Sequence, residues 1–445
     1  MAHTPLTPDA VNVGAVAWTL ISTALVFLMT AGLSFFYGGL VRDTNIINTM
    51  MMSVIAMGVV TMTWVVVGFS LAFGESDAAW VGNFEYALFR NLDMRLWDEK
   101  TGLPGLCFAT YEMTFAIIAS AIISGSLVER VRFSAYVVFL ALWSILIYAP
   151  LAHWVWSPGG WIHKMGTLDF AGGTVIHISS GVSGFVAGAI IGPRRRAEED
   201  LGPTSVPFVI LGGCLLWFGW VGFNGGSALS VSDGVAARAV ASTMVAAASS
   251  MLTWLVLERL LKGRSSSVGA MVGAVAGLVC ITPGAGYVAP SWSIILGLLA
   301  APWCYLSVAA VNRMNLVDDT LDAFGLHGMG GIGGAILTGI FAEEAGLIYT
   351  GSFMLLGKQI VGALASVAFS AIGTAVIVLV MRLVITLRVA EDSELAVDAH
   401  THGETYHSQA KAYHPKEDFR MHSPVKAYQR PDVAVGSSES TSSAV

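Results

Sequence analysis

Charged residues are scarce in this chain. Of its 445 residues only 12% are charged, whereas 55% are hydrophobic, and the mean hydropathy is +0.69. Water-soluble domains carry roughly 25% charged residues, so the composition argues strongly against a soluble globular protein. Apolar runs of helix-spanning length recur from Val11 to about Thr386, which predicts a polytopic membrane protein.

The chain also lacks the common motifs of metal, redox and hydrolytic sites. Its four cysteines are scattered without CxxC spacing, so they predict neither a disulfide framework nor a metal site. It has no nucleophile elbow and no HExxH motif, which disfavours an intramembrane hydrolase built on His and Asp. The first twelve residues, MAHTPLTPDAVN, lack the basic region of a signal peptide, so we expect no cleavage.

Hydropathy predicts eleven membrane-spanning helices, of which the eighth and tenth are short and glycine-rich. The expected spans are 12–38, 46–73, 110–128, 133–154, 172–192, 206–226, 236–261, 268–283, 291–311, 328–342 and 358–386. Arginine and lysine gather in the loops on one side, and the positive-inside rule then predicts an outside N-terminus and an inside C-terminus. We therefore expect an all-α integral membrane fold.

The first five spans resemble the next five in their sequence motifs. The motif FFYGGLV (35–41) resembles FNGGSAL (223–229), and Asp169 with His177 at the fifth span has an echo in Asp322 with His327 at the tenth. Because five is odd, the second copy enters the membrane from the opposite side. This pattern predicts an inverted repeat, which places substrate sites near the bilayer midplane.

The similarity between the two sets of five spans also predicts the domain organisation. The repeats cover about 12–192 and 206–342, and the last helix covers about 358–386, within a transmembrane domain of residues 1–388. Residues 389–445 are polar and poor in aliphatic side chains. We expect them to form a cytoplasmic tail whose distal part is disordered.

Asp169 and His177 are too far apart to contact each other. They are eight positions apart, or about 12 Å along a helix axis. We expect Asp169 to meet the free backbone N–H groups at the helix start. His177 lies about two turns deeper, and His327 is its expected partner. One buried histidine could be an ordinary inter-helix hydrogen bond, but two at matching repeat positions favour a functional site.

Several aromatic residues form a second group of candidates. Tyr111 and Phe115 lie in the third span, Trp156 just after the fourth and Phe223 in the sixth. Each could be an ordinary core or interfacial residue. Together they could instead hold a small cation by cation–π attraction.

These motifs resemble the ammonium transporter family (Amt/Mep/Rh), and specifically its bacterial-type Amt branch. The resemblance runs from about residue 12 to 407. Its motifs are VERVRFS (128–134), AHWVWSPGG (152–160), DFAGGTVIHISSGVSGFVAGAIIGPR (169–194), GWVGFNGGSA (219–228), ITPGAGYV (281–288), DDTLDAFGLHGMGGIGGAILTGIFA (318–342) and HGETY (402–406).

The resemblance implies roles for individual residues. His177 and His327 match the twin histidines of a hydrophobic pore, which pass NH3 and a proton. Trp156 and Ser227 match the outer ammonium-binding site, and Tyr111 stands at a further position of that site. Phe115 and Phe223 match the gate beneath it. Asp169 matches the aspartate needed for recruitment.

The resemblance further implies a transporter that recruits NH4+, deprotonates it and conducts NH3, with separate proton transfer that makes transport electrogenic. It implies a homotrimer in the cell (inner) membrane, with a PII signal protein as a possible partner. We expect no enzyme activity, cofactor, metal or nucleic-acid partner. The alternative is an ammonium sensor that signals to a cytoplasmic partner, although the tail looks too short and polar to be a signalling domain.

One departure from the family pattern leaves two alternatives open. The family often has Phe-Gln where this chain has Tyr111-Glu112. Glu112 could be a local change in packing or hydrogen bonding. A carboxylate so near the expected entrance could also alter cation capture.

Overall fold

The computed structural model describes residues 7–76, 78–93, 95–195, 202–314 and 317–406. The predicted disorder of the distal tail concerns residues 407–445, which lie outside the described residues. Within the described ranges, eleven helices are long and apolar enough to cross a membrane. The predicted eleven-span all-α architecture is therefore confirmed.

The α-helices and strands are α1 (Val13–Leu40), α2 (Ile46–Thr63), α3 (Phe69–Phe73), β1 (Leu96–Asp98), β2 (Leu103–Pro104), α4 (Gly105–Ile122), α5 (Phe133–Trp143), α6 (Ala149–Trp156), α7 (Trp161–Met165), α8 (Ser179–Ile191), α9 (Val206–Gly226), α10 (Val235–Lys262), α11 (Ser267–Ile281), α12 (Pro290–Met314), α13 (Met329–Phe341), α14 (Leu347–Thr350), α15 (Met354–Val384) and α16 (Val397–His402). Short 3₁₀ turns are η1 (Pro8–Ala10), η2 (Asp43–Asn45), η4 (Ala87–Phe89), η5 (Ile123–Ser126) and η8 (Thr282–Gly284). π-Helical turns are η3 (Trp64–Gly68), η6 (Ser144–Tyr148), η7 (Gly173–Ile178) and η9 (Phe324–Gly328).

Polar caps start several of the long helices where apolar sequence begins. The Asn12 side chain accepts from the N–H of Ala15 at 3.1 Å and so caps α1. The Ser266 hydroxyl does the same for α11, accepting from the N–H of Gly269 at 2.9 Å. Such caps satisfy N–H groups that a helix start leaves without a partner.

Three spans begin at least four residues earlier than hydropathy predicts, and one of them is the eleventh, which starts at Met354 rather than 358. The third starts at Gly105 rather than 110, because the antiparallel β1–β2 pair leads directly into it. The tenth starts at Phe324 rather than 328, because a π-helical turn precedes α13. Glycine and histidine in that turn lower its hydropathy, so a sliding average places the boundary too late.

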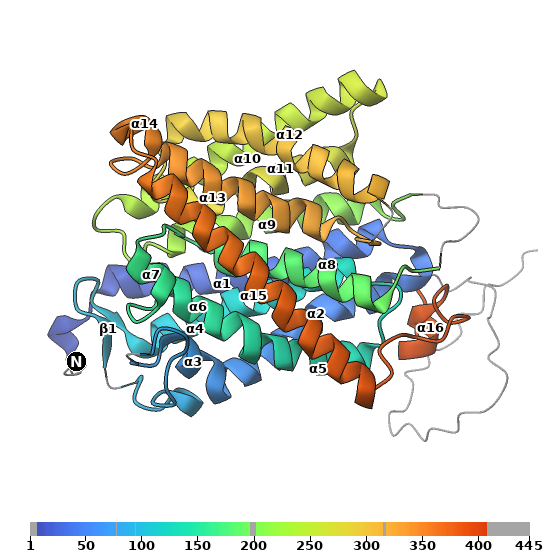
Figure 1. Cartoon of the computed structure of the whole chain (residues 1–445), viewed down its shortest axis with the longest axis horizontal. Coiled ribbons are helices and arrows are strands. Elements are labelled where there is room, and N and C mark those ends of the chain that lie inside the picture. Colours follow the sequence, from blue (N-terminus) through green and yellow to red (C-terminus); the bar gives the residue numbers. More distant parts are fainter. Residues whose placement is uncertain (1–6, 77, 94, 196–201, 315–316, 407–445) are drawn as a thin grey trace, which may run out of the picture. The chain divides into compact units, whose positions relative to one another are not determined.

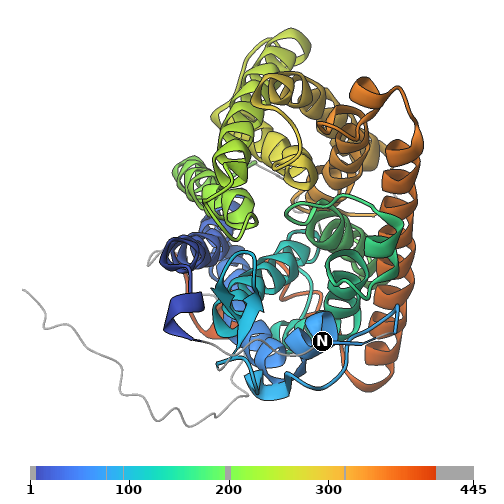
Figure 2. The same cartoon turned by 90° about the vertical axis from the view of Figure 1, so that its left-hand side faces the viewer.

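Helices from the two repeats pack against each other at the centre. α1 packs along α9, α8 lies against η9, and α15 contacts both α8 and α13. Figure 2 shows α15 running beside helices of both repeats. A Cβ at Gly181 of α8 would lie 2.3 Å from the backbone nitrogen of Gly328. Only glycine allows this backbone contact, which brings the fifth and tenth spans together.

The helices have two distinct ends. In Figure 1, α7 and β1 lie at the left end and α16 lies at the right end. We call these the Trp156 end, after the last residue of α6, and the Arg130 end, after the loop between η5 and α5.

Candidate functional site

Asp169 caps the start of the fifth span. Its Oδ1 accepts from the backbone N–H groups of Gly172 (3.0 Å) and Gly173 (2.7 Å). Its Oδ2 accepts from those of Thr174 (2.9 Å) and Val175 (3.1 Å). A helix start leaves such N–H groups free, so the expectation that Asp169 meets them is confirmed. Burial raises the pKa of the Asp169 carboxyl to about 6 against the opposing effect of these four bonds, and the group is therefore mostly ionised at neutral pH.

Trp156 lies directly beside this cap. It is the last residue of α6, not a residue after the helix as the sequence predicts. Its indole N–H donates to the backbone carbonyl of Asp169 at 2.8 Å. The indole is thus fixed to the loop that carries the carboxylate.

Tyr111 and Ser227 meet on the other side of the same end. The Tyr111 hydroxyl lies 2.9 Å from the carbonyl oxygens of both Gly222 and Phe223, and 3.4 Å from Ser227 Oγ. Ser227 in turn donates to the Phe223 carbonyl at 2.9 Å. The two hydroxyls thus both bind the Phe223 carbonyl, one of the last four of α9, which a helix end leaves without an intrahelical partner.

Phe115 and Phe223 pack against each other beside these groups. Their ring centroids are 4.5 Å apart in an edge-to-face arrangement, and both side chains are buried. The Phe115 ring also lies 4.8 Å from Tyr111 and 6.2 Å from Trp156. The five aromatic and hydroxyl side chains predicted at this end therefore form one cluster.

His177 and His327 face each other beyond the phenylalanines. Their Nδ1 atoms are 3.2 Å apart and their rings are stacked with centroids 5.3 Å apart. One Nδ1 must donate and the other accept, so the two neutral imidazoles hold opposite tautomers. Nε2 is then an acceptor on one ring and a donor on the other. The predicted pairing of His177 with His327 is confirmed.

Both histidines sit in π-helical turns, η7 and η9. Such turns are rare and are frequent at functional sites. They widen the helix by one residue, which changes the direction of the side chain. The sequence pattern alone did not reveal either turn.

A narrow cavity lies against the histidine pair. The space open to the centre of a water-sized molecule is about 10 Å³, enough for about one such molecule. The cavity is lined by Met29, Leu33, Ile118, Ile122, His177, Leu216, Trp220, Phe223 and His327. A lining of this kind suits a small neutral molecule, because a cation would lose its hydration there.

Asp319, and not Asp322, is the structural counterpart of Asp169. Its Oδ2 accepts from the N–H groups of Phe324 (2.8 Å) and Gly325 (3.3 Å) at the start of η9. It precedes His327 by eight positions, the spacing of Asp169 and His177. Asp322 has a positive φ of 57° and accepts from the Asn312 side chain at 3.1 Å instead. The sequence pairing with Asp322 is therefore wrong by three positions.

The sequence matches the Ammonium Transporter Family over residues 17–407. The chain belongs to this family. It is 46% identical to an ammonium transporter of Aquifex aeolicus, covering 88% of this chain and 93% of that protein. It is 42% identical to an ammonium transporter of Bacillus subtilis, with coverage of 88% and 98%. The crystal structure of Saccharomyces cerevisiae Mep2 superposes with a TM-score of 0.78 at 32% identity, covering 86% of this chain and 92% of Mep2. A structure called Sensor Amt Protein gives a TM-score of 0.80 at 28% identity, with coverage of 86% and 96%.

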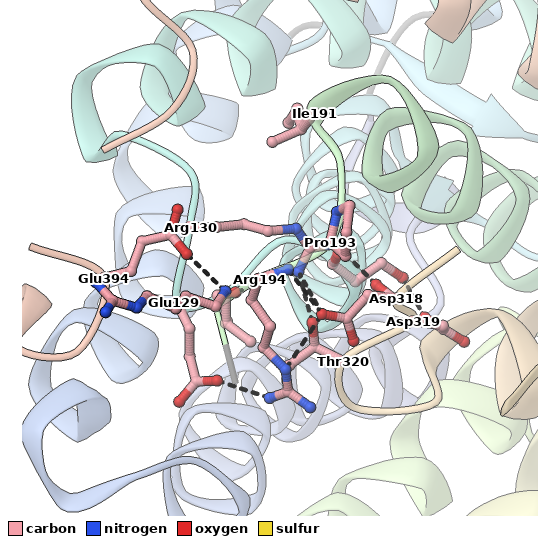
Figure 3. Close-up of polar contacts among 12 residues, drawn as sticks. Glu129, Arg130, Ile191, Pro193, Arg194, Asp318, Asp319, Thr320 and Glu394 are labelled. Carbon is pink, nitrogen blue, oxygen red and sulfur yellow. Dashed lines mark hydrogen bonds and ion pairs between the residues drawn. The ribbon is translucent and has the colours of Figure 1, made fainter. Parts of the chain in front are cut away.

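Sequence reasoning missed a buried ionic cluster at the Arg130 end of this ammonium transporter family member (Figure 3). Arg130 is fully buried and donates to Thr320 Oγ1 (2.6 Å) and to the carbonyls of Ser126 and Asp318 (both 2.7 Å). Arg194 pairs with Asp318 at 3.2 Å and with Glu129 at 2.6 Å. Its residues lie in three of the motifs quoted above, VERVRFS (128–134), the segment ending at Arg194 and the segment beginning at Asp318, but no local pattern links these motifs to one another.

The chain after α15 folds back onto this cluster. Arg388 pairs with Glu394 at 2.5 Å and donates to the Pro193 carbonyl at 2.7 Å. Asp398 accepts from the N–H groups of Ile47 (2.9 Å) and Asn48 (2.7 Å) at the start of α2. The first part of the predicted tail is thus bound to the helices as far as Tyr406, the last described residue.

A metal site finds no support in the described ranges. They contain no group of three or more His, Cys, Asp or Glu side chains that could hold a metal ion.

Proposed function

We propose that this chain transports ammonium by recruiting NH4+ at the Trp156 end, deprotonating it and passing NH3 along the histidine pair. The observation that carries this proposal is the His177–His327 pair, 3.2 Å between Nδ1 atoms, beside a cavity for one water-sized molecule. Ammonia is about as large as water and both accepts and donates hydrogen bonds, as the two imidazoles do.

Recruitment uses a negative field and aromatic faces. The Asp169 carboxylate supplies the charge, and the Trp156, Tyr111 and Phe115 rings attract a cation. The Ser227 hydroxyl has lone pairs free to accept an ammonium N–H, because its own proton is donated to the Phe223 carbonyl. Phe115 and Phe223 then have to move apart for passage, since their rings are in contact.

Deprotonation gives selectivity. Ammonium and potassium ions are of similar size, so a simple charged pore would discriminate poorly between them. A path that only a neutral molecule can cross admits the cation that can lose a proton. The proton crosses separately, and the hydrogen-bonded histidines offer a relay, which makes transport electrogenic.

The wider setting follows from family membership and charge distribution. We propose that the Trp156 end faces outward and the arginine-rich Arg130 end faces the cytoplasm of a cell (inner) membrane. We propose a homotrimer, with the bound C-terminal segment as the region that a PII signal protein would contact.

Ammonium-induced current on a supported membrane tests the proposal. Wild type is compared with His177→Ala, His327→Ala and the double variant, at equal protein density and with potassium as the competing ion. We expect each variant to lose ammonium current or its selectivity over potassium. Unchanged current and unchanged selectivity in the double variant would overturn the role of the pair.

A second candidate function is an ammonium sensor, which the likeness to the Sensor Amt Protein structure favours. A growth test separates the two. A transporter rescues a transport-deficient strain on low ammonium, whereas a pure sensor does not.

A further inference from the structure

Glu112 is a buried carboxylate that the path described above does not use. It follows Tyr111 in α4 and is only 8% exposed, and its Oε2 has no hydrogen-bond partner. Among the described residues, no ion pair joins it to a cation. On the helix it lies about 60° round from Phe115, beside the cluster at the Trp156 end. An unpaired ionisable group inside a membrane span is costly and calls for a functional explanation.

Other unpartnered polar atoms lie on the elements that pack against Glu112. α4 packs against the π-helical turns η6 and η7. The Tyr148 hydroxyl of η6 has no partner, and it lies within electrostatic reach of both the Glu112 and Asp169 carboxylates. Thr174 Oγ1 and His177 Nε2 of η7 also lack partners. Each of these four atoms is a separate unpartnered polar atom on Glu112 or on an element packed against α4.

Two further titratable side chains at this end, Arg95 and His153, are engaged elsewhere. Arg95, which precedes α4, pairs with Glu75 at 3.4 Å and donates to the Tyr86 hydroxyl. The two ring nitrogens of His153 in α6 lie 3.0 Å from the carbonyls of Ala72 and Ala78. Neither side chain compensates the Glu112 charge. Since no ion pair joins Glu112 to a cation among the described residues, a negative Glu112 is open to neutralisation by the substrate cation or by a proton.

We propose that Glu112 takes up the proton that ammonium loses at the Trp156 end. An N–H bond of NH4+ breaks and leaves its electron pair on nitrogen, while the proton bonds to the carboxylate. The products are NH3 and a neutral carboxylic acid. The acid later passes the proton to a water molecule, which restores the carboxylate. This inference rests on the proposed function and adds the proton acceptor to it.

Ammonium-induced infrared difference spectra of proteoliposomes, recorded beside the currents, test the inference. The variants are Glu112→Gln, which keeps shape but cannot take up a proton, and Glu112→Asp, which keeps the carboxyl group. Glu343→Gln is the matched control, because Glu343 pairs with Arg238 at the same end but lies outside the cluster. We expect a carboxylic-acid band on adding ammonium to wild type and to the control, and none in Glu112→Gln.

The ammonium currents of the Glu112 variants should change in the same direction as their infrared spectra. General acid–base groups contribute large rate factors, so we expect Glu112→Gln to lower the saturating current by roughly tenfold or more and Glu112→Asp to recover part of it. An unchanged band and unchanged current in Glu112→Gln would overturn the inference while leaving ammonium transport intact. If wild type itself carries no ammonium current, the proposed function fails instead.

Discussion

The two ends of the histidine path share one construction and differ in their surroundings. At each end an aspartate eight positions before a histidine caps a π-helical turn. Asp169 accepts four backbone N–H groups, whereas Asp319 accepts two, together with the Ser126 hydroxyl at 2.5 Å. The aspartate cap that is common to both ends positions each histidine. The residues around the cap differ between the ends and give them different properties.

The surroundings of the two ends differ in how their polar groups are paired. The Trp156 end has aromatic rings, hydroxyls and the unpaired Glu112, all suited to meeting a small cation. The Arg130 end has a buried network of paired charges that the C-terminal segment completes. Unpaired groups are available to a substrate, while paired groups stabilise a conformation. The comparison therefore predicts that substitutions at the Arg130 end act on stability and that those at the Trp156 end act on transport.

The largest expected effect is on stability, from Arg130→Ala. The change removes the buried donor to Thr320 Oγ1 and to the Asp318 carbonyl and the ion pair of Arg130 with the Asp318 carboxylate at 3.9 Å, and breaking a buried ion pair costs about 3–5 kcal/mol. We expect a loss of that size in the free energy of unfolding, measured by denaturation in mixed micelles. Arg238→Ala is the control, because Arg238 forms a more exposed pair with Glu343 and should cost about 1 kcal/mol or less. Equal losses would contradict a stabilising role for the Arg130 cluster.

Asp169→Asn compared with Asp319→Asn tests the shared cap. In each, an NH2 group replaces an oxygen that accepts backbone N–H groups. Lost charged hydrogen bonds of this kind cost about 3 kcal/mol. For Asp169→Asn we expect that cost to fall on cation recruitment, with a roughly hundredfold weaker apparent ammonium affinity. For Asp319→Asn we expect lower stability with the apparent affinity retained. Ammonium currents measured as a function of ammonium concentration distinguish the two outcomes. Identical behaviour of the two variants would contradict the expected difference between the two ends.

Gly181→Ala tests the contact where the two repeats meet. The new Cβ would lie 2.3 Å from the Gly328 nitrogen, so α8 and η9 must separate, at a cost of about 1–3 kcal/mol. We expect reduced ammonium current, because the histidine pair spans the same contact. Gly58→Ala is the control, since nothing lies within 4 Å of a Cβ there. A Gly181→Ala protein with full current and wild-type stability would show that this close approach does not position the histidines.

Much of the fold could be predicted because span number follows from hydropathy alone. The histidine pair was predicted from the repeat, the aromatic candidates from their positions in the spans and their roles from motif resemblance, and the structure brings them together. The Arg130 cluster could not be predicted, since it joins Arg130 to residues near 320 that no local pattern links to it. The π-helical turns were missed because their sequence resembles that of an ordinary helix.

The error at Asp322 has a different cause. The equal spacing of Asp169–His177 and Asp319–His327 was present in the sequence. The sequence places three acidic residues, Asp318, Asp319 and Asp322, shortly before His327 as possible counterparts of Asp169. The one nearest the predicted helix, Asp322, was chosen, and this choice was wrong. Only the hydrogen bonds decide which carboxylate reaches the free N–H groups of η9.

The smallest expected effect is a pH dependence confined to the Trp156 end. Burial raises the pKa of Asp169 to about 6, so its carboxyl is charged above that pH and neutral below it. Ammonium current should therefore fall as pH on that side drops through 6, to about half at pH 6 and about a tenth at pH 5. At the other end, burial raises the pKa of Asp322 to about 7, but Asp322 caps no helix, so its titration should leave recruitment unchanged. Currents recorded with each side acidified in turn measure this difference, and equal sensitivity on both sides would show that the recruiting field does not come from Asp169.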